Sequence, residues 1–383
     1  MTPLIQSRRK GISSAFTVIE ILVAIAITAV ISTMMVTILS NVLNTWNRSS
    51  AMLAGGNQAR VILDQLALDL ESAYLRRSTD VVFAATIPKN QTGAGDSGAA
   101  GTSWTAGTDV KPGDSAAPNG SLLLNPNDRD FSTYRFGQAG VWLRFFTIPP
   151  DSNEPSSTET LATNLNDVPA PRAVAYQITR RKVGSVNAPY TYQLFRSEVR
   201  PFGTGGTEAR SSFAQGYDLF GAGYNDPSSG GSALGDAGCI RQPRGEFVIG
   251  NGVIDFGVRV LVRDTDDFDN DDNRAELVEA FPVDRRVNNT ATRFVFASTT
   301  DKTKTHPAAA LASGNFTSAQ TSYGYPAVVE IMVRILTPEG VEIMQSYEED
   351  PNRYGGSSAG KWWELAEANS RVFTRRVEIR SSP

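Results

Sequence analysis

Cysteine and histidine are nearly absent from this sequence, and each scarcity excludes a class of site. The chain of 383 residues has one cysteine, Cys239, so no disulfide can form within it. It also has one histidine, His306, which with a single cysteine cannot build a His/Cys zinc site. A Ser-His-Asp or Cys-His triad would depend on His306, and no G-x-S-x-G nucleophile motif is present. These absences favour a protein that is not an enzyme.

An excess of charge of either sign is also lacking. The 36 Lys and Arg residues against 40 Asp and Glu residues give a net charge of −4. This balance produces no field that would attract a polyanion to the whole molecule, so nucleic acid is not an expected partner.

Charge, glycine and proline are all missing from residues 21–39, ILVAIAITAVISTMMVTIL. The run is close to the ~20 residues that a helix needs to cross a hydrocarbon core about 30 Å thick. It has no polar face, unlike a buried soluble helix, and no small-residue cleavage site follows it, unlike a secretory signal. We therefore expect a transmembrane segment at about 21–39 that stays attached. Residues 1–15 carry Arg8, Arg9 and Lys10 and no acid, which predicts a cytoplasmic N-terminus.

A second helical pattern follows at residues 57–77. At the helical period its apolar residues fall on one broad face and its charged residues in a polar wedge, so this helix must pack on another part of the protein. The apolar face consists of Ile62, Leu63, Leu66, Leu70 and Tyr74, and the wedge of Arg60, Asp64 and Glu71.

The segment AFTVIEILVAIAI, residues 15–27, resembles the signal of type IV pilins and of the pseudopilins of type II secretion. In that family a prepilin peptidase removes the leader and methylates the new amine. The resemblance implies cleavage between Ala15 and Phe16 and N-methylation of Phe16. The family usually has glycine where this chain has Ala15. The implied organisation is a cleaved basic leader at 1–15, a pilin-type helix at 16–77 and a periplasmic β-rich domain at 78–383.

Glu20 is the one acidic residue at the head of the apolar run. A charged side chain at the centre of a bilayer costs about 3 kcal/mol on insertion scales, so it persists only with a partner or a function. No Lys or Arg lies within 21–39 to pair with it. In pilins the resemblance implies an assembly contact between this carboxylate and the N-terminal amine of a neighbouring subunit. The simpler interpretation, that Glu20 lies at headgroup level, is disfavoured by the full motif.

Beyond residue 78 the pattern changes to strict alternation, which predicts half-buried antiparallel strands. In residues 253–263, apolar side chains from Ile254 to Val262 face one way, and Asp255, Arg259 and Arg263 face the other. Residues 327–336 alternate in the same way. Further strands are expected at 121–124, 141–147, 173–180, 191–198, 293–297, 341–345 and 372–379. The fold class is therefore α+β, a long N-terminal helix packed on an antiparallel β-rich domain with long Gly-rich insertions at 90–120 and 203–238.

Four strand segments, at 174–182, 190–200, 251–263 and 325–342, resemble those of the J-type minor pseudopilin of type II secretion. The resemblance implies a minor pseudopilin of a periplasmic pseudopilus or its tip. It also implies a single-pass protein of the bacterial inner membrane, with prepilin peptidase and other minor and major pseudopilins as partners. Two alternatives stay open. One is a minor type IV pilin of an adhesion or DNA-uptake machine, and the other is a membrane-anchored periplasmic enzyme or binding protein.

One acidic loop is a candidate metal site. Asp267, Asp269 and Asp271 alternate as oxygen ligands do in Ca²⁺ loops. An EF-hand is excluded, because Asp272 stands where the loop needs glycine and Val278 where it needs a bidentate acid. An irregular Ca²⁺ loop and a solvated acidic hairpin are the two remaining interpretations, and no other cofactor is expected.

Overall fold

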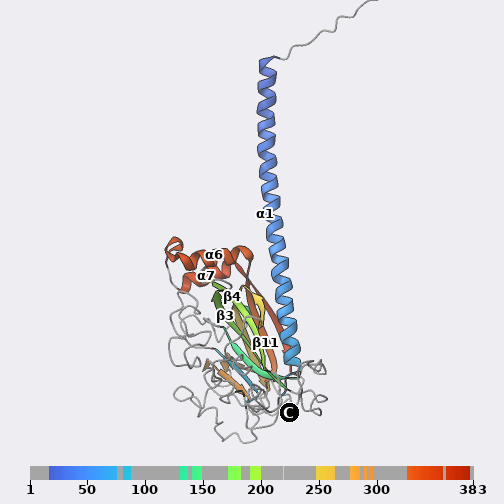
Figure 1. Cartoon of the computed structure of the whole chain (residues 1–383), viewed down its shortest axis with the longest axis vertical. Helices are drawn as coiled ribbons and strands as arrows, with labels where there is room; N and C mark the ends of the chain where they lie inside the picture. The colour runs from blue at the N-terminus through green and yellow to red at the C-terminus, as the bar shows by residue number, and fades with distance from the viewer. Residues whose placement is uncertain are drawn as a thin grey trace, which may run out of the picture. The chain divides into compact units, whose positions relative to one another are not determined.

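The apolar run continues without interruption into the amphipathic segment as one helix, α1 (Val18–Glu71), in the computed structural model of the chain (Figure 1). The chain divides into two units, Met1–Ala54 and Gly55–Pro383. The structure describes residues 17–75, 81–87, 130–136, 140–148, 171–182, 190–199, 219, 247–263, 277–284, 289–290, 293–296, 326–356 and 359–379.

Antiparallel pairing builds the described sheets of the second unit. A six-stranded sheet has the order β10-β1-β2-β3-β4-β5, a four-stranded sheet the order β12-β11-β6-β7, and β8 pairs with β9. The strands of the first sheet are β1 (Phe83–Thr86), β2 (Trp142–Thr147), β3 (Arg172–Lys182), β4 (Tyr190–Val199), β5 (Val248–Asn251) and β10 (Arg293–Phe296). Those of the others are β6 (Val253–Arg263), β7 (Leu277–Phe281), β8 (Val283–Asp284), β9 (Asn289–Thr290), β11 (Pro326–Leu336) and β12 (Ser370–Glu378). An N-terminal apolar helix followed by antiparallel sheets is the α+β arrangement that the sequence predicts.

Most strands predicted from alternation are confirmed. The predictions at 141–147, 173–180, 191–198, 293–297 and 372–379 coincide with β2, β3, β4, β10 and β12. The strand predicted at 121–124 and most of both Gly-rich insertions lie outside the described residues.

The C-terminal part of α1 packs on the sheets as its apolar face predicts. Ile62, Leu66 and Leu70 are fully buried in one hydrophobic core with residues of both large sheets. Backbone hydrogen bonds fix the end of the helix, because the Tyr74 N–H donates to the Phe146 carbonyl at 2.7 Å. Apolar burial and backbone pairing therefore act together at this end of α1.

The strand predicted at 341–345 is wrong. These residues belong to helix α6 (Pro338–Glu349). Thr337 caps the helix by accepting the Gly340 N–H at 3.0 Å, and Pro338 occupies the first turn, where its missing N–H costs nothing. The buried residues Gly340, Met344 and Tyr347 then recur at helical rather than strand spacing.

The expectation that β6 and β11 are half-buried holds at Arg259, Arg263 and Glu330, which stay partly or fully exposed, but it is wrong at the other end of the pair. Asp255 on β6 is fully buried and Arg334 on β11 is 5% exposed, although both belong to the faces expected to be solvated. Segments distant in sequence cover those faces. The Phe136 N–H donates to Asp255 Oδ2 at 3.2 Å, and Arg334 approaches Glu367 of helix α7 (Ala359–Ala368) at 3.9 Å.

The C-terminal segment forms a second small core. Figure 1 shows α6 and α7 side by side at one end of the strands β3 and β4, joined by the 3-10 helix η6 (Pro351–Tyr354). Trp362 and Trp363 are each 1% exposed, and their rings meet edge to face at 4.9 Å. They pack in a cluster with Tyr192, Ile254, Leu336, Met344, Tyr347 and Ala366. From there the chain enters β12, which completes one edge of the second sheet.

The close contact between β6 and the segment that covers it gives a stability prediction. A Cβ at Gly257 would overlap the ring of Phe136, which is fully buried and packs against Phe131 and Tyr134. We expect Gly257→Ala to lower the free energy of unfolding by about 1–3 kcal/mol, the usual cost of overpacking. Urea denaturation of the full chain in detergent micelles, followed by tryptophan fluorescence, measures this difference.

Gly360 in α7 is the matched control, because nothing lies within 4 Å of a Cβ added there. Gly360→Ala should leave stability unchanged or raise it by up to about 1 kcal/mol, since alanine favours helices over glycine. Equal destabilisation by both substitutions would contradict the packing argument.

Candidate functional site

Glu20 lies in the first turn of α1 and caps its own helix. Its carboxylate oxygen Oε2 accepts the backbone N–H of Thr17 at 2.9 Å and the Thr17 hydroxyl at 3.1 Å. In return the Glu20 N–H donates to the Thr17 hydroxyl oxygen at 3.3 Å. This reciprocal pair is a capping box, in which a threonine and the glutamate three residues later satisfy each other's backbone donors.

The capping box occupies one of the two carboxylate oxygens of Glu20. Both bonds from Thr17 end on Oε2, and no hydrogen bond from the described part of the chain ends on Oε1. Since an ionised carboxylate accepts through both oxygens, Glu20 can cap α1 and still accept a donor from another molecule. The predicted cleavage residues Ala15 and Phe16 lie outside the described residues.

The apolar part of α1 is not covered by the residues that the structure describes. Residues Val18–Trp46 form the one described helix that is long and apolar enough to cross a membrane, and none of that stretch is buried. Its hydroxyl groups are satisfied within the helix, because Thr28, Thr33 and Thr37 donate to carbonyls four residues earlier at 2.7, 2.8 and 2.9 Å. The segment therefore presents apolar surface without unsatisfied side-chain hydroxyls at these positions.

A buried ionic network joins α1 to the first sheet. Asp69 on α1 is 2% exposed and accepts two hydrogen bonds from Arg196 on β4, from Nε to Oδ2 at 2.6 Å and from Nη2 to Oδ1 at 3.0 Å. The Tyr176 hydroxyl on β3 also donates to Asp69 Oδ2. Arg196 Nη1 binds Glu198 at 2.7 Å, and Glu198 binds Arg172 at 3.4 Å. The paired geometry gives both oxygens of the buried Asp69 carboxylate charge-assisted hydrogen bonds.

Burial and the contacts with Asp69 shift the pKa values of Tyr176 and Arg196. Desolvation raises the pKa of the Tyr176 hydroxyl well above its ordinary value, and the charge of Asp69 raises it further, so Tyr176 keeps its proton and donates. Desolvation alone would lower the pKa of Arg196, but the hydrogen bonds and charge of Asp69 outweigh it and raise that pKa above its ordinary value. Arg196 is therefore permanently charged opposite Asp69.

Our reading of the sequence missed this network, although each member leaves a trace there. Asp69 lies on the apolar face of α1, three residues after Leu66 and four before Ala73. The sequence therefore has an acidic residue on the face of the helix that is buried. Tyr176 and Arg196 are register partners on β3 and β4. Only the register of β3 and β4 shows that Tyr176 and Arg196 lie side by side and that both contact Asp69.

A second ionic group fixes α7. Arg135 binds Glu367 through two parallel hydrogen bonds at 2.7 and 2.6 Å, and its guanidinium lies 5.4 Å from the centre of the Trp363 ring. Arg334 approaches the same carboxylate and lies opposite Asp255 in the sheet register. These contacts hold the C-terminal helix against the sheet.

The predicted calcium ligands Asp267, Asp269 and Asp271 lie outside the described residues, as do Cys239 and His306. Among the residues that the structure describes, no cluster of three or more His, Cys, Asp or Glu side chains is arranged to bind a metal ion. The calcium loop therefore stays a prediction.

Comparison with known proteins adds no relative. No family model matches the chain, and neither a curated protein nor a solved structure matches it. A functional argument for this protein therefore depends on its own residues.

Loss of the Asp69 carboxylate should destabilise the second unit strongly. Asp69→Ala removes the bidentate partner of Arg196 and leaves it only Glu198, and breaking such a buried pair is expected to cost about 3–5 kcal/mol. Replacing both Asp69 and Arg196 by leucine should cost less than the sum of the two single leucine variants, because neither charge is then left without the other. Urea denaturation of the four proteins in detergent gives the coupling energy.

An exposed ion pair provides the control for this double-mutant comparison. Lys361 and Glu364 lie 2.9 Å apart with side chains 29% and 67% exposed. Glu364→Ala should cost less than about 1 kcal/mol, because solvent screens the pair. If the losses of unfolding free energy in the two single leucine variants add up to the loss in the double variant, the buried contact between Asp69 and Arg196 contributes no coupling energy.

Proposed function

We propose that this chain is a minor pilin-like subunit, most similar to the J-type minor pseudopilin of type II secretion. Its function is structural, as part of a short periplasmic filament or its tip. The helix α1 would insert in the bacterial inner membrane with a cytoplasmic N-terminus, and the β-rich domain would face the periplasm. Prepilin peptidase would remove residues 1–15, and other minor and major pseudopilins would be its partners.

The observation that carries this proposal is the state of Glu20. Its oxygen Oε2 is occupied by Thr17, while Oε1 faces no donor from the described residues. Cleavage after Ala15 would not disturb the capping box, because Thr17 would keep an amide N–H. A neighbouring subunit's amine at Phe16 could then bind Oε1 as a charge-assisted hydrogen bond. The carboxylate would cap its own helix and pair with a neighbour at the same time.

The exposed apolar helix supports the same function. None of Val18–Trp46 is buried by the residues that the structure describes, and its surface can be covered by lipid or by apolar helices of other subunits. Pairing with an amine would remove the free-energy cost of holding the charged Glu20 in the bilayer. This gain would favour transfer of the subunit from the membrane into an assembly.

Processing is the direct test of the proposal. When the full chain is coexpressed with a prepilin peptidase, the product should lack residues 1–15 and begin with N-methylated Phe16, as intact-mass measurement and N-terminal sequencing will show. Ala15→Leu should abolish cleavage, because the peptidase accepts only small residues there in the family the signal resembles. An unprocessed chain would favour a membrane-anchored protein of another kind.

Substitutions at Glu20 separate capping from assembly. Glu20→Gln keeps an oxygen that can accept the Thr17 N–H but removes the charge, so membrane insertion and cleavage should persist while incorporation into a filament or tip complex falls about tenfold or more. The amount of subunit recovered with sheared and pelleted filaments measures incorporation.

Thr17→Ala is the matched control, because it removes the cap and leaves the carboxylate. A helix cap is worth about 1 kcal/mol, so this variant should still be incorporated. If Thr17→Ala fails and Glu20→Gln assembles normally, Glu20 serves as a cap and the assembly contact is wrong.

A further inference from the structure

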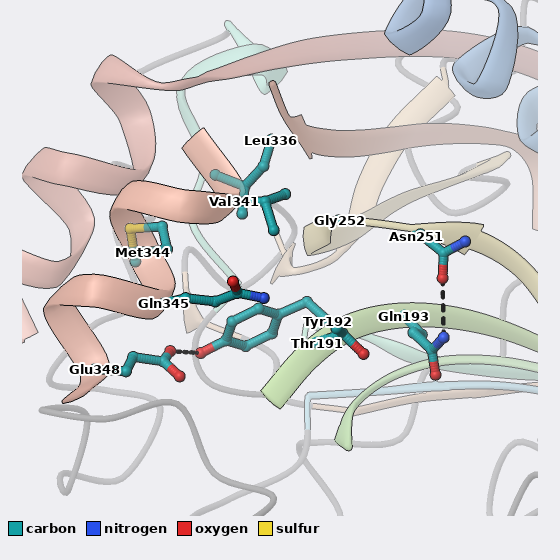
Figure 2. A pocket seen from close by; sticks show the side chains of 10 residues that line it. All are labelled: Thr191, Tyr192, Gln193, Asn251, Gly252, Leu336, Val341, Met344, Gln345 and Glu348. Carbon is teal, nitrogen blue, oxygen red and sulfur yellow. Dashed lines mark hydrogen bonds between the residues drawn. The ribbon is translucent and has the colours of Figure 1, made fainter. Parts of the chain in front are cut away.

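A small cavity opens between α6 and the strand ends of the second unit. It has a volume of about 220 Å³, and Figure 2 shows the side chains that line it. Leu336, Val341 and Met344 line its apolar part, and Tyr192, Gln345 and Glu348 line its polar side. Sites for whole small ligands usually enclose about 300–1,000 Å³, so this space suits one or two side chains better than a cofactor.

The walls of this cavity are fixed before anything binds. The Gly252 N–H donates to the Tyr192 carbonyl at 2.7 Å, and the Gly252 carbonyl accepts the Leu336 N–H at 2.9 Å. Gly252 has a φ of +69°, a conformation that favours glycine. The Tyr192 hydroxyl donates to Glu348, as Figure 2 shows, which ties β4 to α6 across the cavity. A preformed cavity binds a side chain without the cost of ordering its own walls.

The helix beside the cavity is strongly acidic. The segment from Thr337 to Asp350 contains five acidic residues and no Lys or Arg, namely Glu339, Glu342, Glu348, Glu349 and Asp350. Glu342 and Glu349 are exposed, and each follows a cavity-lining residue of α6 by one helical step of about 100°. They therefore lie next to the cavity on the solvent side of the helix.

An apolar cavity bordered by negative charge selects the chemistry of what docks there. We propose that this surface binds a protein segment that inserts one aliphatic side chain between Val341 and Met344 and places Lys or Arg residues beside Glu342 and Glu349. Burial of the anchor supplies affinity, and the opposite charges supply orientation and rate of association. The surface belongs to the second unit and uses neither Glu20 nor cleavage, so this proposal and the proposed pilin-like function fail independently.

The test uses the full chain in neutral detergent micelles with ¹³C-methyl-labelled methionine. The chain has six methionines, of which Met344 lines the cavity and Met332 is buried in the main core. The probe is the peptide acetyl-KKLKK-amide, compared with acetyl-KKSKK-amide and acetyl-EELEE-amide. We expect the first peptide alone to shift the Met344 methyl signal in a saturable way and to leave Met332 in place.

Charge reversal checks the acidic border. The double variant Glu342→Lys with Glu349→Lys should raise the dissociation constant of acetyl-KKLKK-amide by about tenfold, at the upper end of what two exposed charge contacts contribute. The control, Glu364→Lys with Glu378→Lys, changes the net charge by the same amount away from the cavity and should alter it by less than about twofold.

Three results would overturn the proposal. The first is a Met344 signal that does not move at millimolar acetyl-KKLKK-amide. The second is an equal response to the serine or glutamate peptide. The third is a Met344 shift that depends on protein concentration without peptide, which would identify a second copy of the chain as the occupant.

Discussion

The bidentate contact between Asp69 and Arg196 is the constraint on which the second unit depends. It joins α1 to β4 inside the core, and Tyr176 of β3 donates to the same carboxylate. The close packing of an apolar helix face limits its movement on a sheet, and a buried ion pair adds a contact that has one satisfactory position. The network therefore fixes the register of α1 on the sheet together with the backbone hydrogen bond from Tyr74 to Phe146, and burial of Ile62 and Leu66 adds hydrophobic stabilisation.

Glu20, at the opposite end of α1, is a second carboxylate that needs hydrogen-bond donors, but its donors differ from those of Asp69. Asp69 receives its donors from within the chain, so its role is internal. Glu20 receives its donors from Thr17 on a single oxygen, and none of the residues that the structure describes donates to the other oxygen. This difference from Asp69 is what supports the assembly contact that we propose for Glu20.

The C-terminal segment changes the character of the sheet that it covers. Residues 130–136 and α7 enclose one face of β6 and β11, which makes Asp255 and Arg334 buried residues. The tryptophans of α7 then form a second core with α6. In this position α6 borders a cavity with its acidic side exposed, so the segment that covers the sheet also carries the surface for which we propose a protein partner.

The sequence by itself determined the features that depend on local period. These are the apolar helix, the amphipathic face of Ile62, Leu66 and Leu70, and most strands, because each is written in residues a few positions apart. The prediction from sequence was wrong at α6, where we expected a strand and gave too little weight to the helix cap at Thr337. It was also wrong at Asp255 and Arg334, because segments distant in sequence bury these two side chains. The tertiary structure alone decided that Asp69, Tyr176 and Arg196 meet. That contact depends on strand register and helix position, which no local pattern specifies.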